Sequence, residues 1–323
     1  MMKYLRNLLL VAALVSGQGA YAQDMPQIRA ATLKIGTVNW ELSTIKAQGF
    51  DHANGFELVM QPYADNGATR VAFEGGRADL IVADWIWTAR QRSAGRDYVF
   101  LPYSKAVGGL VVPADSTAQS LADLAGGKIG IAGGPLDKSW LILRAYAASE
   151  YGLDLTEQTE QVFAAPPLIY KTGLGGETQG SVNYWHYLSR MKAEGMRELI
   201  SVSDAAQSLG LNPDTPLLGY VLRESFVADN PGVLQALHDA SRAAKDLLAS
   251  DDAVWDDLRP MMRVGSDAEF IATRDDFRAG IPPDKPVDRE DADRFLQLMA
   301  RLGGEKLVGK ATTLPDGLFA QVD

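Results

Sequence analysis

The 323-residue chain contains no cysteine, and this absence excludes several kinds of chemistry. Structural disulfides, thiol nucleophiles, cysteine-ligated metals and a lipid-acylated cysteine anchor are all excluded. The three histidines, His52, His186 and His238, have no metal-ligand spacing to one another or to acidic pairs. No nucleophile elbow or triad order is present, and the glycines at 173–176 lack a nucleotide-binding pattern. We therefore expect no metal, no cofactor and no enzymatic activity.

Long hydrophobic runs are also missing. The apolar stretch from Leu8 to Val15 is shorter than the about 20 residues that a membrane-spanning helix needs, and no comparable run follows it. Lys3 and Arg6 precede this stretch, and Ala20-Tyr21-Ala22 follows it, which is the order of a secretory signal peptide. We expect residues 1–22 to be a signal peptide that is cleaved after Ala22. The mature protein is then expected in the periplasm, free of a membrane anchor.

Positive charge is scarce in this chain. It has 31 Lys and Arg against 41 Asp and Glu, a formal net charge of −10. Residues 1–22 contain two basic residues and no acidic one, so their removal changes the net charge from −10 to −12. An excess of negative charge this large disfavours nucleic acid and anionic lipid as partners.

Short apolar runs bounded by turn residues alternate with helical patterns along most of the chain. This alternation predicts an α/β fold with mostly parallel sheets. A mature chain of about 300 residues exceeds one compact core, which predicts two lobes. The expected strands are residues 32–38, 56–61, 80–83, 109–112, 128–132, 161–164, 181–185, 199–202 and 219–222.

Several short motifs occur in a characteristic order: Leu33-Lys34-Ile35-Gly36, the segments 73–80 and 120–131, Asn230-Pro231 and the segment 277–282. In this order the chain resembles the periplasmic binding proteins of the nitrate, sulfonate, taurine and thiamine-precursor importer family. The resemblance implies a type II periplasmic binding fold. Residues 28–107 and 210–323 would form lobe 1, and residues 108–209 would form lobe 2.

The resemblance also implies a function and partners. The chain would be a monomeric, periplasmic solute-binding component that delivers a small organic molecule to an ABC permease in the inner membrane. The same fold carries desulfinases and pyrimidine synthases that rely on cysteine-bearing sites, and this chain has no cysteine. The alternative is a ligand-sensing or accessory protein associated with a periplasmic enzyme or sensor.

Ligands of open α/β sheets bind beyond the carboxyl ends of the strands, and in a two-lobe protein these ends line a shared cleft. This rule selects the candidate ligand-binding residues Asn39, Trp40, Asp84, Trp85, Gly134, Asp137, Lys138, Ser139, Trp140, Asn183, Tyr184, Trp185 and Tyr220. The aromatic members could sandwich a flat ring or cage a cation, or they could be core residues.

The segment 133–140 is the most specific of these candidates. Its glycines allow close backbone approach, and the start of the next helix presents N–H groups that can hold an oxyanion. Asp137 and Ser139 could instead cap that helix, as Asp84 could cap the helix that follows it. Since Lys138 is the only cation in this turn, the sequence disfavours a strongly anionic ligand. Asp84 and Asp137, if both face the cleft, favour a neutral polar or amine-bearing one.

Overall fold

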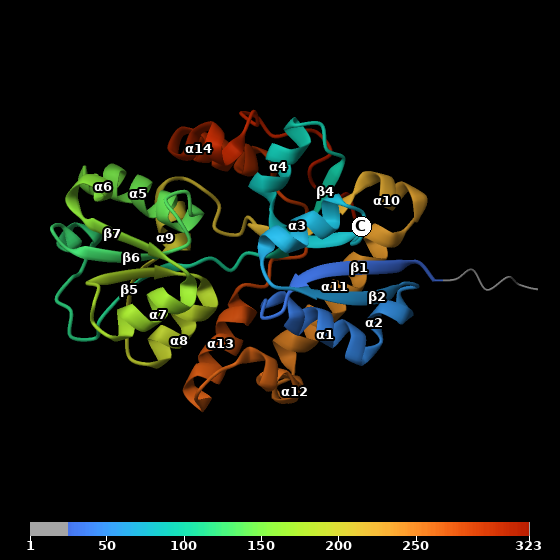
Figure 1. The fold of residues 1–323 in the computed structure, drawn as a ribbon, viewed down its shortest axis with the longest axis horizontal. Coiled ribbons are helices and arrows are strands. Elements are labelled where there is room, and N and C mark those ends of the chain that lie inside the picture. Colours follow the sequence, from blue (N-terminus) through green and yellow to red (C-terminus); the bar gives the residue numbers. More distant parts are fainter. Residues whose placement is uncertain (1–24, 323) are drawn as a thin grey trace, which may run out of the picture.

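The strands form two separate five-stranded sheets, and the helices pack on them (Figure 1). The structure, a computed structural model, describes residues 25–322. We define lobe 1 as the sheet β2-β1-β3-β10-β4 with the helices packed on it, and lobe 2 as the sheet β7-β6-β8-β5-β9 with its helices. The two-lobe α/β fold predicted from the sequence is confirmed.

The two sheets follow the same plan. In lobe 1, β2 and β3 pair in parallel with β1, whereas β10 runs antiparallel to β3 and β4. In lobe 2, β7 and β8 pair in parallel with β6, whereas β5 runs antiparallel to β8 and β9. The strands are β1 (Gln27–Leu33), β2 (Glu57–Tyr63), β3 (Leu80–Asp84), β4 (Tyr98–Ser104), β5 (Gly109–Val112), β6 (Lys128–Ala132), β7 (Glu160–Ala164), β8 (Gly180–Asn183), β9 (Arg197–Ser201) and β10 (Leu218–Arg223).

Helices cover both faces of each sheet. Alternate residues of β10 show the two faces of lobe 1, because Val221 packs in one apolar cluster and its neighbours Tyr220 and Leu222 pack in another. The helices are α1 (Val38–Gln48), α2 (Phe50–Ala53), α3 (Asn66–Glu74), α4 (Trp85–Ser93), a 3₁₀ turn (Leu121–Leu124), α5 (Lys138–Tyr151), α6 (Leu155–Gln158), α7 (Pro166–Leu174), α8 (Trp185–Ala193), α9 (Val202–Ser208), α10 (Glu224–Asp229), α11 (Val233–Ser250), α12 (Ala253–Met262), α13 (Asp267–Ala279) and α14 (Arg289–Val308).

The first strand lies earlier in the chain than predicted. The apolar pattern predicted a strand over residues 32–38, but β1 ends at Leu33 and α1 begins at Val38. The backbone N–H of Gly36 donates to the carbonyl of Leu33 over 3.1 Å, which turns the chain out of the sheet. Ile35 continues the apolar pattern, yet 52% of its surface is exposed.

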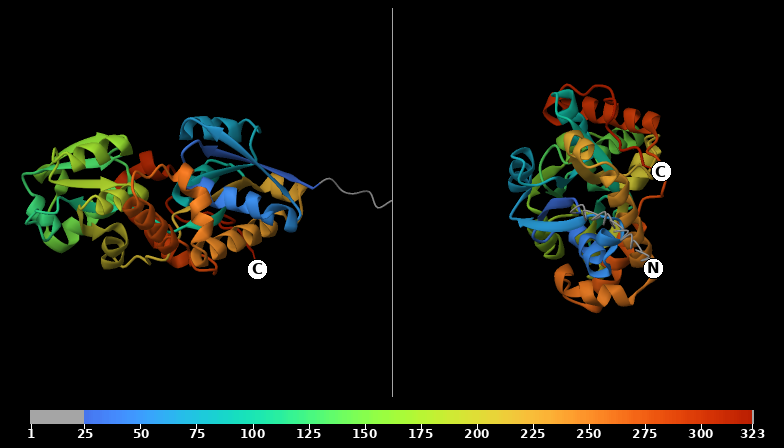
Figure 2. Two further views of the ribbon diagram at one scale, coloured as in Figure 1. Left: turned by 90° about the horizontal axis from the view of Figure 1, so that it is seen from below. Right: turned by 90° about the vertical axis from the view of Figure 1, so that its right-hand side faces the viewer.

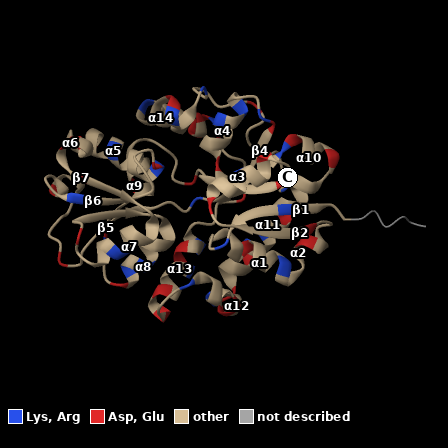
Figure 3. Ribbon diagram, in the orientation of Figure 1, with Lys and Arg blue, Asp and Glu red and all other residues tan. Residues whose placement is uncertain are grey.

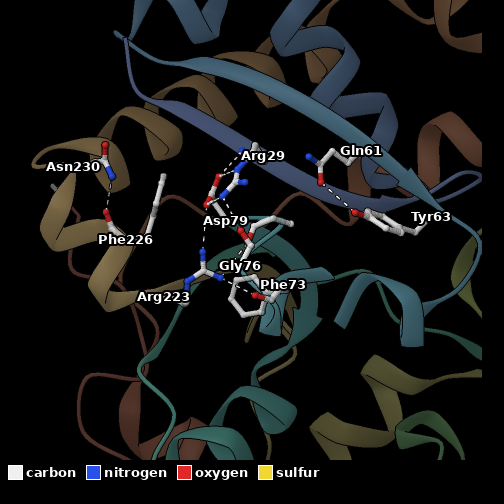
Figure 4. A network of polar contacts seen from close by, with 10 residues as sticks. Arg29, Gln61, Tyr63, Phe73, Gly76, Asp79, Arg223, Phe226 and Asn230 are labelled. Carbon is white, nitrogen blue, oxygen red and sulfur yellow. Dashed lines mark hydrogen bonds and ion pairs between the residues drawn. The ribbon is translucent and has the colours of Figure 1, made fainter. Parts of the chain in front are cut away.

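A buried carboxylate fixes three strands of lobe 1 to one another (Figure 4). Asp79, directly before β3, accepts two hydrogen bonds of 2.7 Å from the guanidinium of Arg29 in β1. Arg223, at the end of β10, lies 3.3 Å from the same carboxylate and also donates to the carbonyls of Phe73 and Ala78. Since Asp79 is almost fully buried, these two cations compensate a charge that could not otherwise remain in the core.

A second buried charge lies between α1, α11 and β10. The Nζ of Lys245 is 2.7 Å from Oε2 of Glu41, and both side chains are almost fully buried. The other carboxylate oxygen of Glu41 accepts hydrogen bonds from Tyr220 over 2.8 Å and from Ser241 over 2.6 Å. Burial lowers the pKa of Lys245, and the facing carboxylate of Glu41 opposes that shift. This network holds α1 and α11 against the sheet.

Removing one partner of this buried pair should destabilise the protein strongly. We predict that Lys245→Met lowers the free energy of unfolding by about 3 to 5 kcal/mol, because Glu41 is left as an unpaired buried charge. The control is Lys128→Met, which breaks the exposed pair of Lys128 with Glu160 (3.1 Å) and should change stability by about 0 to 1 kcal/mol. Urea unfolding measures both values. Equal losses for the two variants would contradict the assigned role of Lys245.

Candidate functional site

An ion pair joins the two lobes where the strands end. The Nζ of Lys138, at the start of α5 in lobe 2, lies 3.1 Å from Oδ2 of Asp84 at the end of β3 in lobe 1. Both side chains are largely shielded from solvent, with 22% and 14% of their surfaces exposed. The carboxyl ends of β3 and β6 therefore approach each other.

Asp84 and Asp137 each cap a helix that starts at this junction. Asp84 accepts a hydrogen bond of 2.8 Å from the backbone N–H of Trp87 in α4. Asp137 accepts one of 3.1 Å from the backbone N–H of Trp140 in α5. Burial raises the pKa of Asp137, and the nearby carboxylate of Asp84 adds to this rise. The capping role considered from the sequence is thus present, and Asp84 pairs with the facing lobe as well.

The glycine-rich turn before α5 lies next to Tyr184. A Cβ atom on Gly133 would be 3.4 Å from the hydroxyl of Tyr184 and 3.7 Å from Oδ2 of Asp137. A Cβ atom on Gly134 would have no neighbour within 4 Å, so the space beside this residue is open. Tyr184 is 41% exposed, and the turn and this tyrosine together form a polar surface that faces away from the core of lobe 2.

An aromatic cluster forms a further contact between the lobes. The ring of Trp40 in α1 meets that of Trp185 in α8 edge to face, with the centroids 5.9 Å apart. Phe277 of α13 lies 5.9 Å from Trp40 and 6.3 Å from Trp185, and Trp255 completes the cluster. Trp40 is 4% exposed and Trp185 is half-buried, so the lobe 1 side of the cluster is the side shielded from solvent.

Three predicted site residues lie in the core instead of the cleft. Trp85 is fully buried, with its ring 5.6 Å from Phe295 and 6.0 Å from Phe319. Trp140 is 1% exposed in the core, and Tyr220 points into the Glu41 network. Trp85 and Trp140 lie in helices that follow β3 and β6, and Tyr220 lies inside β10; the helix geometry and the alternation of β10 turn these side chains inward.

The remaining candidates lie near the junction with different roles. Asn183 is buried, and its amide donates to the carbonyl of Pro166 and accepts from the N–H of Tyr184, so its hydrogen bonds are used within lobe 2. Ser139 lies close to the connection between the lobes, 3.4 Å from the position of a Cβ on Gly108. Asn39 at the start of α1 donates to the carbonyl of Leu33 over 2.8 Å.

The two tryptophans that follow strand ends should respond differently to truncation. We predict that Trp85→Ala lowers the free energy of unfolding by about 3 to 5 kcal/mol, because it empties a buried site. Trp185→Ala should cost much less and should increase the radius of gyration, because it removes an interlobe contact. Chemical unfolding and solution scattering distinguish the two. A larger stability loss for Trp185→Ala would show that this ring belongs to the core.

The sequence did not predict the contacts of α13 with lobe 2. Glu269 of α13 accepts a hydrogen bond of 2.8 Å from Tyr170 and lies 3.3 Å from Arg190. Asp276 accepts one of 2.6 Å from Ser189 and lies 3.1 Å from Lys192. Figure 2 shows this helix, in orange, between the lobes, and Figure 3 shows its acidic residues. Each partner is more than 75 residues away in the chain, so no local pattern reveals these contacts.

His186 is a second residue whose surroundings the sequence did not reveal. Its Nδ1 is buried without a hydrogen-bond partner, and its ring centroid lies 4.6 Å from that of Tyr187. Burial lowers the pKa of His186 to about 4, and the positive charge of Arg190 contributes to this shift. The imidazole is therefore neutral at neutral pH and contributes no charge to the junction.

The lowered pKa of His186 predicts a pH dependence of stability. The unfolded chain takes up this proton near the ordinary pKa of 6.5, whereas the folded chain takes it up only near 4. Stability should therefore fall as the pH falls from 6.5 to 4. His186→Gln should reduce the slope of unfolding free energy in this window by up to about 1.4 kcal/mol per pH unit. Denaturant unfolding across this range measures it, and an unchanged slope would contradict the assignment.

The chain is similar to a known protein family and to several solved structures. A family model described as NMT1/THI5 like matches residues 42–253. The periplasmic aliphatic sulphonate binding protein SsuA from Escherichia coli is similar in structure, with a TM-score of 0.71 and 18% identity over 91% of this chain and 94% of that one. The search of curated protein sequences found no match.

Two further solved structures share the fold. The alkanesulfonate-binding protein SsuA from Xanthomonas axonopodis pv. citri, bound to MOPS, has a TM-score of 0.68 and 17% identity over 94% of this chain and all of that one. The desulfurization enzyme DSZB has a TM-score of 0.59 and 14% identity over 90% of this chain and 97% of that one. The fold is therefore shared by binding proteins and by an enzyme.

The structure describes the helices and side chains of residues 25–322. None of the helices in this range is both long and apolar enough to cross a membrane. No group of three or more His, Asp or Glu side chains in the same range could hold a metal ion. The expected signal peptide at residues 1–22 lies outside the part of the chain that the structure describes.

Proposed function

Because this chain belongs to the NMT1/THI5-like family, we propose that it is the solute-binding component of an ABC-type importer. It captures a small organic molecule between its lobes. One observation carries this proposal: the carboxyl ends of β3 and β6 approach each other from separate sheets, and the pair of Lys138 with Asp84 spans the junction. Such strand ends are the usual ligand site of open α/β sheets.

The proposed cleft combines one polar side and one aromatic side. Asp137 and Tyr184 lie beside Gly133, next to the open space at Gly134, and Asp84, Lys138 and Ser139 add polar groups at the same junction. Asn39 adds an amide, and Trp40 and Trp185 supply an aromatic edge contact from the two lobes. A site with a few polar groups beside aromatic rings suits a small organic ligand.

The proposed lobe boundaries and cellular location are those expected from the sequence. Residues 28–107 and 210–323 form lobe 1, residues 108–209 form lobe 2, and the lobes close about the connections near 104–109 and 203–219. The protein acts as a periplasmic monomer after removal of residues 1–22 and delivers its ligand to an ABC permease in the inner membrane. Binding without catalysis is supported by the absence of cysteine and by the sulfonate-binding neighbours.

Ligand binding and closure test this proposal together. We predict that at least one compound in a thermal-shift screen of sulfonates, amines, pyrimidines and short acids stabilises the protein. A ligand present at about 100 times its dissociation constant adds about 2.7 kcal/mol. Solution scattering with that compound should show a smaller radius of gyration. The absence of both a shift and a closure with every compound class would overturn the proposal.

A further inference from the structure

One hydrogen-bond acceptor near the start of α1, in Asn39, has no partner. The Nδ2 of Asn39 donates to the carbonyl of Leu33, which fixes the amide orientation and leaves Oδ1 as the free end. This oxygen is buried and has no hydrogen-bond partner. Since a buried, unsatisfied acceptor is costly, a ligand that donates a hydrogen bond here would be stabilised. Asn39 follows β1, which pairs directly with β3 and thus lies beside the strand that ends at Asp84.

The junction carries more negative than positive charge, which disfavours an anionic ligand. Asp84 and Asp137 contribute two carboxylates, and Lys138 forms its ion pair with Asp84. Within residues 25–322, Asp137 forms no ion pair within 4 Å, and the charge of Lys138, which also acts on Asp137, is shared with Asp84. Its Oδ1 is occupied by the backbone N–H of Trp140, whereas Oδ2 lies beside the glycine turn and the Tyr184 hydroxyl.

Each of the two helix starts at the junction already carries a capping carboxylate. An N-terminal helix end attracts an oxyanion through its unpaired N–H groups and its partial positive charge. In α4 the N–H of Trp87 donates to Asp84, and in α5 the N–H of Trp140 donates to Asp137. A sulfonate would have to compete with both carboxylates for the same N–H groups and would also be repelled by them. An ammonium group does not compete for these N–H groups and is attracted by Asp137, beside the ring of Tyr184.

We propose that the cleft selects an organic amine and rejects sulfonates, with Asp137 as the specificity-determining carboxylate. This inference rests on the proposed function, since it concerns the ligand of the same cleft. The amine donates to Oδ2 of Asp137, and the buried oxygen of Asn39 accepts a second N–H of the ligand. The pair of Lys138 with Asp84 stays formed and holds the lobes together around the ligand.

Matched ligands separate the charge of the head group from the rest of the molecule. Isothermal titration of the mature protein with n-alkylamines of two to six carbons, and with n-alkanesulfonates of the same lengths, compares equal apolar chains with opposite charges. We expect binding of at least one amine and an affinity at least tenfold lower for the sulfonate of the same length. Tryptophan fluorescence provides a second readout, because Trp40 and Trp185 meet at the junction.

Variants test whether Asp137 carries the selectivity. Asp137→Asn should lower amine affinity at least tenfold, and asparagine still caps α5, so the fold should persist. The control is Asp154→Asn, because Asp154 caps the short helix α6 of the same lobe through the N–H of Thr156, at an exposed position. The control should keep wild-type affinity. Thermal unfolding of both variants verifies that they are folded.

Three results would overturn this inference: tighter sulfonate than amine binding by the wild type, no amine binding, or unchanged amine affinity in Asp137→Asn. None of these contradicts the proposed function if another compound of the thermal-shift screen binds and closes the lobes. If no compound of any class does so, the proposed function fails as well.

Discussion

The helices that begin at the carboxyl ends of the central strands impose the main constraint on this junction. Each such helix starts with backbone N–H groups that have no partner within the helix. In α4 and α5 one such group, the N–H of Trp87 and that of Trp140, donates to Asp84 and Asp137, which places two carboxylates where the lobes approach each other. The ion pair of Lys138 with Asp84 follows from this arrangement, because it compensates one of the two charges across the junction. Helix capping and interlobe contact thus depend on the same side chains, and so does the proposed ligand preference.

Much of the fold could be predicted from the sequence because its strands are bounded by turn residues. The predicted strands 109–112 and 128–132 coincide with β5 and β6, each followed by a proline or glycine within the next two residues. The first strand was misplaced because Ile35 extends the apolar pattern beyond Leu33, although the chain has already left the sheet there. The sequence pattern shows which residues are apolar, but the strand ends where the N–H of Gly36 bonds to the carbonyl of Leu33.

The candidate site was harder to predict than the fold, since side-chain direction depends on distant segments. Trp85 begins a helix directly after β3, and Trp185 begins a helix one residue after β8. The sequence around them does not show which ring is buried. Trp85 is buried by Phe295 and Phe319, more than 200 residues later in the chain, whereas Trp185 meets Trp40 of the other lobe. Likewise, the partners of Tyr220 in the Glu41 network come from two separate helices.

Helix α13 gives the two lobes an interdependence that the order of the chain conceals. It follows lobe 1 segments in sequence, yet its acidic side chains are satisfied by α7 and α8 of lobe 2. A fragment made of lobe 2 alone would lose Glu269 and Asp276 and would leave Arg190 and Lys192 without these counter-charges. The smaller lobe is therefore not an autonomous module that could be excised or exchanged between relatives, unless the α13 segment is transplanted with it.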